Sequence, residues 1–240
     1  MNIPDWQIRT ELLLGKEALI KLKNAHVFVL GLGGVGAYTA EMLCRAGIGR
    51  MTIGDGDRVQ PSNINRQLIA MESTLGEEKA EVMARRLREI NPEIELRVIT
   101  EFLHEEKLDS VLETHYDYVV DAIDTLSPKV FLIIRTLGKG YPIVSSMGAG
   151  GKLDPLQVMV TDISKSYNCR LAHSLRKQLH RMGVHNGFKV VFSPETVSRN
   201  SVKLIDNEAN KRSTVGTISY MPPLFGCVMA SVVLRELVLQ

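Results

Sequence analysis

A glycine-rich turn between an apolar strand and an apolar helix constrains the fold of this chain more than any other feature. The run Gly31-Leu32-Gly33-Gly34-Val35-Gly36 follows apolar residues 27–30 and precedes a helix expected over residues 37–46. Glycines let the backbone turn sharply and approach a ligand, and the free N–H groups of the helix then face an anion. The pattern predicts a phosphate-binding turn, with a tight structural turn as the alternative. Alone, it would suggest a dinucleotide enzyme.

An acidic loop follows the next expected strand, residues 50–54. Asp55 lies about twenty residues past the glycines, where an acidic side chain accepts hydrogen bonds from ribose hydroxyls. A solvated turn aspartate is the alternative. Asp57 is expected to shape this loop or to assist metal binding.

Polar and basic residues come next. Asn63, Arg66 and Gln67 follow the acidic loop, and Lys79 lies near the start of a helix expected over residues 77–90. A dehydrogenase has little reason to bring such cations to a phosphate turn, whereas displacement of pyrophosphate from ATP builds negative charge that cations stabilise. For a lone Arg or Lys, a surface position is the alternative.

Asp124 is the candidate metal ligand. The apolar strand expected over residues 118–120 leads into Asp121-Ala122-Ile123-Asp124. Open parallel sheets bind ligands at the carboxyl ends of their strands, and carboxylate oxygens suit Mg²⁺. Asp124 is therefore predicted to hold Mg²⁺, with a helix N-cap as the alternative. Gln67 and Lys129 are candidates of second rank for the site.

Strands and helices alternate through most of the chain, which predicts an α/β fold with a doubly wound, Rossmann-like and mainly parallel sheet. Further strands are expected over residues 96–100 and 142–145, and further helices over 108–114 and 128–139. Strands over 157–161 and 189–193, around a basic helix over 171–181, predict a C-terminal mixed or antiparallel extension. We expect a single domain over residues 1–240, with a nucleotide-binding core (1–155) and a substrate-facing extension that ends in a closing helix (156–240).

The net charge of +2 is unevenly distributed. Residues 165–212 contain ten Lys or Arg and three acids, which gives +7, so the remainder of the chain carries −5. Such asymmetry indicates a polyanionic partner or, alternatively, a solvated basic helix face.

The three cysteines, Cys44, Cys169 and Cys227, form no C-x-x-C pair and no disulfide framework, which favours a cytoplasmic protein without structural zinc. Cys44 and Cys227 are expected to be small buried hydrophobes. Cys169 lies in a polar stretch, so a thioester nucleophile is the alternative there. The first fifteen residues lack a signal-peptide pattern. The apolar run 221–234 contains two prolines and is expected to be too short to span a bilayer, so no membrane partner is predicted.

Five motifs taken in order resemble the adenylating domain of ubiquitin-activating, molybdopterin-synthase-adenylating and ThiF-like enzymes. They are Gly31-x-Gly33-Gly34-x-Gly36, Asp55-x-Asp57, Asn63-x-x-Arg66-Gln67, Lys79 and Asp121-x-x-Asp124. Further segments resemble the branch that dehydrates threonylcarbamoyladenosine in tRNA. These are Arg9-Thr10-Glu11 with the following Leu12-Leu13-Leu14-Gly15, Pro128-Lys129 after Asp124, and residues 148–155 and 160–165. The resemblance covers most of the chain and is weakest over residues 168–212.

The resemblance implies ATP and Mg²⁺ as cofactors and tRNA carrying threonylcarbamoyladenosine as the partner. It implies that Arg66, Lys79, Asp124 and Arg9 are catalytic, and that Arg9 reaches the ATP of a second subunit in a homodimer. The substrate carboxylate would be adenylated, and a ureido nitrogen would then close a hydantoin ring. A sulfur-transfer protein is a further partner that the family admits.

Two other functions remain open. An enzyme of the same fold adenylates the Gly-Gly tail of a ubiquitin-like sulfur carrier, but the absent zinc cysteines and the basic segment disfavour it. A non-catalytic or NAD-binding Rossmann module would not explain Arg66, Lys79 and Asp124 together.

Overall fold

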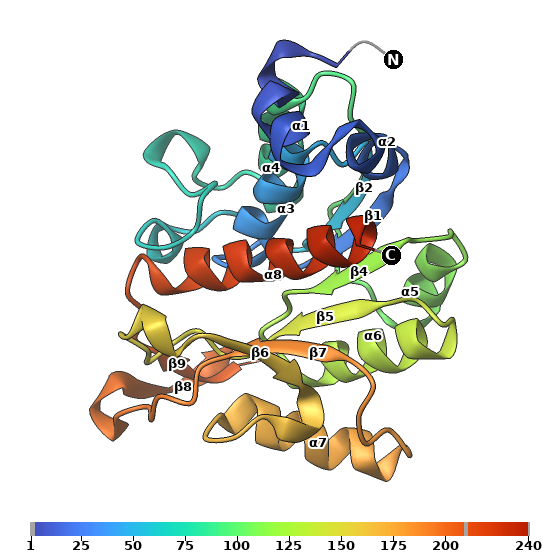
Figure 1. The fold of residues 1–240 in the computed structure, drawn as a ribbon. Coiled ribbons are helices and arrows are strands. Elements are labelled where there is room, and N and C mark those ends of the chain that lie inside the picture. The colour runs from blue at the N-terminus through green and yellow to red at the C-terminus, as the bar shows by residue number, and fades with distance from the viewer. Residues whose placement is uncertain (1–2, 209–210, 240) are drawn as a thin grey trace.

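A seven-stranded sheet forms the centre of the molecule in the computed structural model, which describes residues 3–208 and 211–239. The strand order is β3-β2-β1-β4-β5-β7-β6 (Figure 1). The strands are β1 (His26–Leu30), β2 (Arg50–Gly54), β3 (Glu95–Ile99), β4 (Tyr118–Asp121), β5 (Ile143–Ser146), β6 (Met159–Asp162) and β7 (Lys189–Phe192). All neighbours pair in parallel except β6, which is antiparallel to β7. The predicted doubly wound sheet with a mixed C-terminal extension is therefore confirmed.

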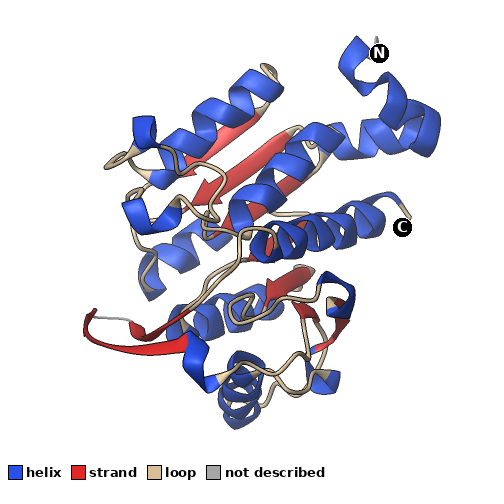
Figure 2. Cartoon of the chain, turned by 90° about the vertical axis from the view of Figure 1, so that its left-hand side faces the viewer, coloured by secondary structure: helices blue, strands red, loops and turns tan. Residues whose placement is uncertain are grey.

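Helices cover both faces of the sheet (Figures 1 and 2). One face carries α2 (Lys16–Asn24), α3 (Gly36–Ala46), α4 (Lys79–Ile90) and α8 (Met221–Val238); the other carries α5 (Glu105–Leu112), α6 (Leu126–Gly138) and α7 (Arg170–Arg181). Successive side chains of a strand point to opposite faces. In β1, Val27 and Val29 therefore pack into the core on one side, and Phe28 and Leu30 into the core on the other. Burial on both faces explains why the central strands are continuous apolar runs.

The turn between β1 and α3 requires its glycines. A Cβ on Gly36 would lie 1.8 Å from the carbonyl oxygen of Gly31, and Gly31 itself has a φ of +90°. The last helix closes over this turn, because Pro222 and Gly226 of α8 lie against Gly34 and Val35. Thr39 Oγ1 donates a hydrogen bond of 3.2 Å to the Gly226 carbonyl. Residues far apart in the sequence, on α3 and on α8, thus pack together around the glycine turn.

Helix α8 is longer than the apolar run expected over residues 221–234. It continues to Val238 and spans 18 residues with a mean hydropathy of 1.5, so by length and composition alone it could cross a membrane. Its residues Phe225, Met229 and Val233 are fully buried in the core that covers the sheet. The predicted role as a closing helix on the sheet is therefore confirmed, and the prediction that the run is too short to span a bilayer was wrong.

Cys227 also differs from expectation, because it is exposed on α8 rather than buried. Cys44 is buried as predicted, and its thiol donates to the Leu87 carbonyl at 3.5 Å. Burial raises the pKa of the Cys44 thiol to about 12. An inert packing role follows for Cys44.

Several elements have other bounds or were not expected. Helix α5 begins at Glu105 and ends at Leu112, earlier than the predicted helix over residues 108–114. Helices α1 (Ile8–Leu14) and α2 precede the sheet, and a hairpin of β8 (Val202–Glu208) and β9 (Lys211–Val215) projects from the body of the molecule (Figure 2). Residues 209–210, which belong to the basic segment 165–212, lie outside the described residues. The short 3-10 helices are η1 (Asp5–Gln7), η2 (Pro61–Asn63), η3 (Glu72–Thr74), η4 (Pro155–Gln157), η5 (Ile163–Lys165) and η6 (Arg199–Ser201).

Candidate nucleotide-binding and catalytic site

The predicted site residues gather at the carboxyl ends of the parallel strands, with one exception. The glycine turn follows β1, the acidic loop follows β2, and Asp124 lies in the loop after β4. Because neighbouring parallel strands end at the same edge, residues distant in sequence meet there. The exception is Arg9, which is exposed on α1, a helix that packs chiefly against η1 and α2.

Asp55 joins the glycine turn to the acidic loop. The backbone N–H of Leu32 donates to Asp55 Oδ2 at 2.6 Å, and the N–H of Asp57 donates to Oδ1 at 2.9 Å. Burial raises the pKa of Asp55, while nearby Lys79 and these two hydrogen bonds oppose the rise. A carboxylate has about four lone-pair sites, so Asp55 keeps acceptor capacity for a ligand hydroxyl beside the phosphate turn.

Lys79 is the first residue of α4 and is only 5% exposed. Its Nζ donates to Asp57 Oδ2 at 2.8 Å. Asp57 therefore has a structural partner, and the contact holds the ammonium beside the acidic loop. A buried lysine with one carboxylate partner retains N–H donors for an anionic ligand.

Gln67 is another predicted site residue whose surroundings are unusual. Its side chain is buried, and its Oε1 has no hydrogen-bond partner among the described residues. Gln67 Nε2 would lie 3.6 Å from a Cβ built on Gly33, so the amide faces the glycine turn. A buried polar atom without a partner costs about 1–3 kcal/mol, and this cost points to a ligand that completes the site. Asn63 differs, since its Oδ1 already accepts from the Gln60 N–H at 3.0 Å and shapes η2.

Arg66 and Asp124 lie on different loops within electrostatic reach of each other. Burial lowers the pKa of the Arg66 guanidinium, and the Asp124 carboxylate opposes that shift. Arg66 Nη1 also donates to the Ser62 carbonyl at 2.7 Å and to Asn65 Oδ1 at 2.8 Å, which fixes its direction. The Arg66 guanidinium and the Asp124 carboxylate therefore lie near each other at the sheet edge that carries the phosphate turn.

Asp124 itself is exposed, and Thr125 rather than Asp124 occupies the N-cap position of α6. Within residues 3–208 and 211–239, no three His, Cys, Asp or Glu side chains are grouped so that they could hold a metal ion. Mg²⁺ commonly takes one or two carboxylates and completes its shell with substrate phosphates and water. The arrangement fits a metal bound together with a nucleotide better than a metal held by protein ligands alone.

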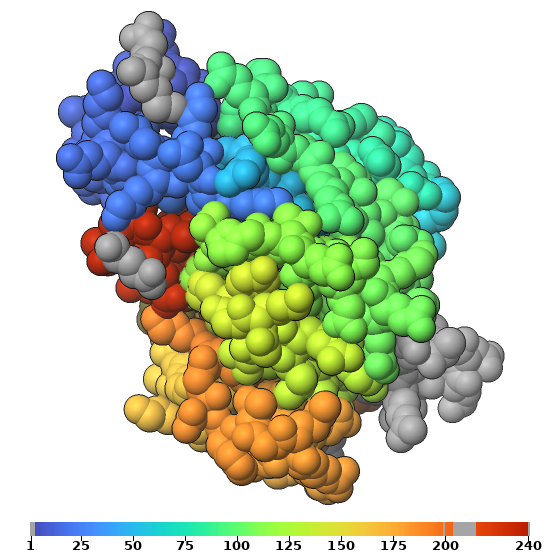
Figure 3. All heavy atoms as spheres, turned by 90° about the vertical axis from the view of Figure 1, so that its right-hand side faces the viewer, coloured from blue at the N-terminus to red at the C-terminus, as the bar shows by residue number. Residues whose placement is uncertain are grey.

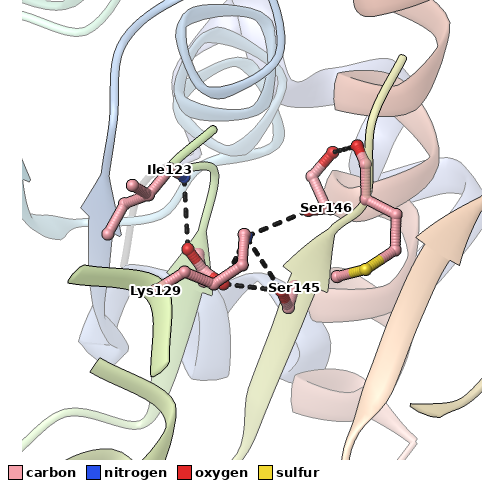
Figure 4. A network of polar contacts seen from close by, with 6 residues as sticks. Ile123, Lys129, Ser145 and Ser146 are labelled. Carbon is pink, nitrogen blue, oxygen red and sulfur yellow. Dashed lines mark hydrogen bonds and ion pairs between the residues drawn. The ribbon is translucent and has the colours of Figure 1, made fainter. Parts of the chain in front are cut away.

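A buried network supports the loop that carries Asp124 (Figure 4). Lys129 Nζ donates to Asp121 Oδ2 at 2.6 Å, to Ser145 Oγ at 3.1 Å and to the Ser146 carbonyl at 3.0 Å. Ser145 Oγ donates to Asp121 Oδ2 at 2.5 Å, and Asp121 Oδ1 accepts from the Ile123 N–H at 3.2 Å. Both charged side chains are fully buried. Sequence reasoning ranked Lys129 second and gave Ser145 no role, because the pairing across β4 and β5 appears only in the fold.

The loops after β5 and β7 are joined by two residues that sequence reasoning did not single out. Lys152 is buried and its Nζ contacts the Glu195 carbonyl, while the Glu195 carboxylate accepts from the N–H groups of Leu153 and Asp154 at 2.9–3.0 Å. Burial lowers the pKa of Lys152, and Cys169 and Glu195 oppose the shift. Cys169 is only 8% exposed, which disfavours its alternative role as a nucleophile.

Comparison with known proteins gives consistent matches. The sequence profile of the ThiF family matches residues 5–239. The tRNA threonylcarbamoyladenosine dehydratase of Bacillus subtilis is 39% identical over 236 residues, which are 95% of this chain and 93% of that protein. The crystal structure of the Escherichia coli enzyme of that name, TcdA, in complex with ATP has a TM-score of 0.88 at 36% identity and covers 99% of this chain and 97% of that chain.

A sulfur-carrier enzyme is less similar. The adenylyltransferase and sulfurtransferase MOCS3 of Drosophila yakuba is 34% identical over 140 residues, which are 58% of this chain and 30% of that protein. The likeness to the dehydratase of Bacillus subtilis therefore extends over nearly the whole chain, and the likeness to MOCS3 over 58% of it.

Proposed function

The chain belongs to the ThiF family, and on that premise we propose that it is an ATP-dependent dehydratase that cyclises threonylcarbamoyladenosine in tRNA. One observation carries this proposal: the likeness to the dehydratases in sequence and in fold spans 93–97% of their length. An ATP complex of the Escherichia coli relative supports ATP as the nucleotide. The family likeness also supports a reaction that releases AMP and pyrophosphate.

ATP supplies the activation of the threonine carboxylate, since adenylation turns a carboxylate oxygen into a good leaving group. The N–H groups of the glycine turn bind the phosphates, and Asp55 accepts from the ribose hydroxyls. Arg66 and Lys79 balance the charge that develops on the phosphates, with Asn63 and Gln67 beside them. Asp124 binds Mg²⁺ together with phosphate oxygens. Gln67 Oε1, a buried acceptor with no hydrogen-bond partner among the described residues, is the feature of this chain that best fits a bound nucleotide.

Ring closure needs no nucleophile from the protein. The ureido nitrogen and the activated carboxyl belong to the same substituent, and intramolecular attack has a high effective molarity. The role left for the protein is to hold the substituent in place and to exclude water. The burial of Cys169 is in keeping with such a route.

Mass spectrometry of nucleosides tests this function. tRNA that carries threonylcarbamoyladenosine is incubated with the protein, ATP and Mg²⁺, and is digested under mild conditions. The expected result is an ATP-dependent loss of one water from that nucleoside. No loss of water, together with ATP–pyrophosphate exchange only when a Gly-Gly-tailed carrier is added, would instead assign the sulfur-carrier reaction.

We also propose that the active form is a homodimer in which Arg9 reaches the nucleotide of the other subunit. Arg9 is exposed on α1, a helix that packs chiefly against η1 and α2, and two neighbouring leucines of α1, Leu12 and Leu13, are each 82% exposed. Apolar side chains that are this exposed favour burial against a partner. A symmetric dimer would place α1 of each subunit against the other.

Subunit mixing tests this arrangement. Arg9→Ala and Lys79→Ala are each expected to be inactive, because each lacks one group of every site. When the two variants exchange subunits in equal amounts, mixed dimers contain one intact site, and about a quarter of the wild-type activity is expected to return. Recovery is measured as dehydrated nucleoside per subunit. If no activity returns although mixed dimers form, Arg9 does not act across the dimer.

We further propose that residues 1–240 act as one adenylating unit, in which residues 1–155 bind the nucleotide and residues 156–240 face the tRNA. We also propose that the protein acts in the cytoplasm, where tRNA is modified. A sulfur-transfer protein is a further proposed partner.

A further inference from the structure

Helix α7 lies in a segment whose charge differs from that of the rest of the chain. Residues 165–189 contain six Lys or Arg and no Asp or Glu. Four of these six cations lie in the twelve residues of α7, which also contain two histidines; the basic residues of the helix are Arg170, His173, Arg176, Lys177, His180 and Arg181. A run of this kind is either a solvated face or a binding surface for a polyanion, and the contacts of its cations distinguish these possibilities.

Four of the cations form no ion pair with a described residue, although the Asp162 carboxylate interacts electrostatically with Lys165. Lys165, Arg170, Lys177 and Arg181 are exposed, and none forms an ion pair with any of the residues that the structure describes. We call Arg170, Lys177 and Arg181, the three that lie on α7, the cationic line. Neighbouring carboxylates do not neutralise it, so its positive potential extends into solvent.

Several arginines on other helices pair with acids. Arg86 of α4 binds Glu41 of α3, and Arg135 of α6 binds Asp109 of α5. Helix α6 also lacks acids, but its two cations, Lys129 and Arg135, have carboxylate partners on other elements. No cation of α7 forms an ion pair with a residue that the structure describes. The gathering of four cations without an ion pair on one helix therefore favours an anionic partner for α7.

The cationic line is straight and faces outward. Ala172, Leu175 and Leu179 of α7 are buried in the core beneath the sheet. Arg170, Lys177 and Arg181 are spaced at i, i+7 and i+11, which brings them onto one line of the opposite helix surface, roughly 16 Å long at 1.5 Å per residue. In Figures 1 and 3 this region forms one end of the molecule and is open to solvent.

The cationic line begins beside the edge of the sheet that carries the phosphate turn and Asp124. Just before α7, the ring of Tyr167 packs on Phe192, the last residue of β7, with centroids 5.7 Å apart. Cys169 interacts electrostatically with Lys152 in the loop after β5. Arg170 therefore starts at the edge where the phosphate turn and Asp124 lie, and the line leads away from that edge.

We propose that the cationic line of α7 binds the phosphate backbone of tRNA next to the nucleotide that is modified. This inference rests on the proposed function. A single nucleoside enters the reaction site, so the rest of the tRNA must be held by neighbouring surface, and phosphate contacts supply most of such binding without reading sequence. The unpaired cations give the required charge, and their straight order suits a polynucleotide strand.

The test uses the triple variant Arg170→Gln, Lys177→Gln and Arg181→Gln. The affinity for tRNA is expected to fall by about tenfold or more at 0.1 M salt, and the slope of log K against log salt should become shallower by roughly 2–3, because each lost phosphate contact removes about 0.7–0.9. Filter binding at several salt concentrations measures both. Protection of the protein by ATP against heat should not change.

A matched control removes the same charge elsewhere. Lys21→Gln, Arg88→Gln and Arg97→Gln replace one exposed lysine and two exposed arginines of α2, α4 and β3. This control is expected to bind tRNA like the wild type. If both triple variants bind tRNA with the same affinity and salt slope, the cationic line is not the tRNA surface. The proposal fails equally if the α7 variant loses binding only to anionic lipid vesicles and keeps tRNA.

The dehydration assay separates this inference from the proposed function. If wild-type protein does not dehydrate threonylcarbamoyladenosine in tRNA, the proposed function fails whatever α7 binds. If the wild type is active and the α7 variant shows an unchanged KM for tRNA, the function stands and the inference about α7 is overturned. The expected result is a raised KM with kcat largely retained.

Discussion

Replacing Lys129 with alanine is expected to lower the free energy of unfolding by roughly 3–5 kcal/mol, because it leaves the fully buried Asp121 carboxylate without its cation. The same change should reduce turnover, since Asp121 also accepts from the Ile123 N–H and so fixes the loop that leads to Asp124. Urea unfolding measures the first effect, and formation of the dehydrated nucleoside measures the second.

Two controls accompany this experiment. Lys139→Ala removes an exposed lysine just after the same helix and should change stability by no more than about 0.5 kcal/mol. The double variant Lys129→Met with Asp121→Asn removes both charges and keeps an amide oxygen for the Ile123 N–H. It is expected to recover most of the lost stability. A Lys129→Ala protein that unfolds at the wild-type urea concentration would show that the network does not stabilise the fold.

Replacing Asp124 with alanine is expected to abolish detectable turnover, with a loss of at least about 10²–10³-fold, while the fold stays intact. The side chain is exposed, so its removal leaves no cavity. If Asp124 binds Mg²⁺, the Asp124→Asn variant should also need a Mg²⁺ concentration about tenfold higher for half-maximal activity. Nucleoside mass spectrometry and thermal unfolding measure the two properties.

The matched control is Glu106→Ala, which removes another exposed carboxylate on α5 and should leave activity unchanged. Substantial turnover by Asp124→Ala would remove Asp124 from the metal-binding role. Asp124 would also be removed from that role if the Asp124→Asn variant needed the same Mg²⁺ concentration as the wild type for half-maximal activity, even if its turnover were low.

The central part of the fold was predictable because its local signals agree. Strands such as β1 and β4 are buried on both faces and therefore read as short apolar runs, and α4 repeats its buried residues at helical spacing. Elements with little buried surface gave no such signal. Helix α1 buries none of its residues and α2 buries only three, and neither helix was expected.

Side-chain environment was harder to predict than secondary structure. Cys227 was expected in the core because α8 is apolar nearly all round, so the sequence does not distinguish its outward face from its inward face. The candidate site shows the same limit. Asp55 and Lys79 were named from motif spacing. The environment of Gln67 Oε1, which has no hydrogen-bond partner among the described residues, and the contact between Lys129 and Ser145 depend instead on neighbours that only folding brings close.

The packing of α8 on the glycine turn has a consequence for how the protein is made. Thr39 and Gly226, which share a hydrogen bond, are 187 positions apart, so the ribosome completes the phosphate turn long before it makes the helix that covers it. Contacts between such distant parts of a chain form late in folding. We therefore expect a growing chain to remain without a competent nucleotide site until its last helix emerges, so that translation that stops early yields an inert polypeptide instead of one that consumes ATP.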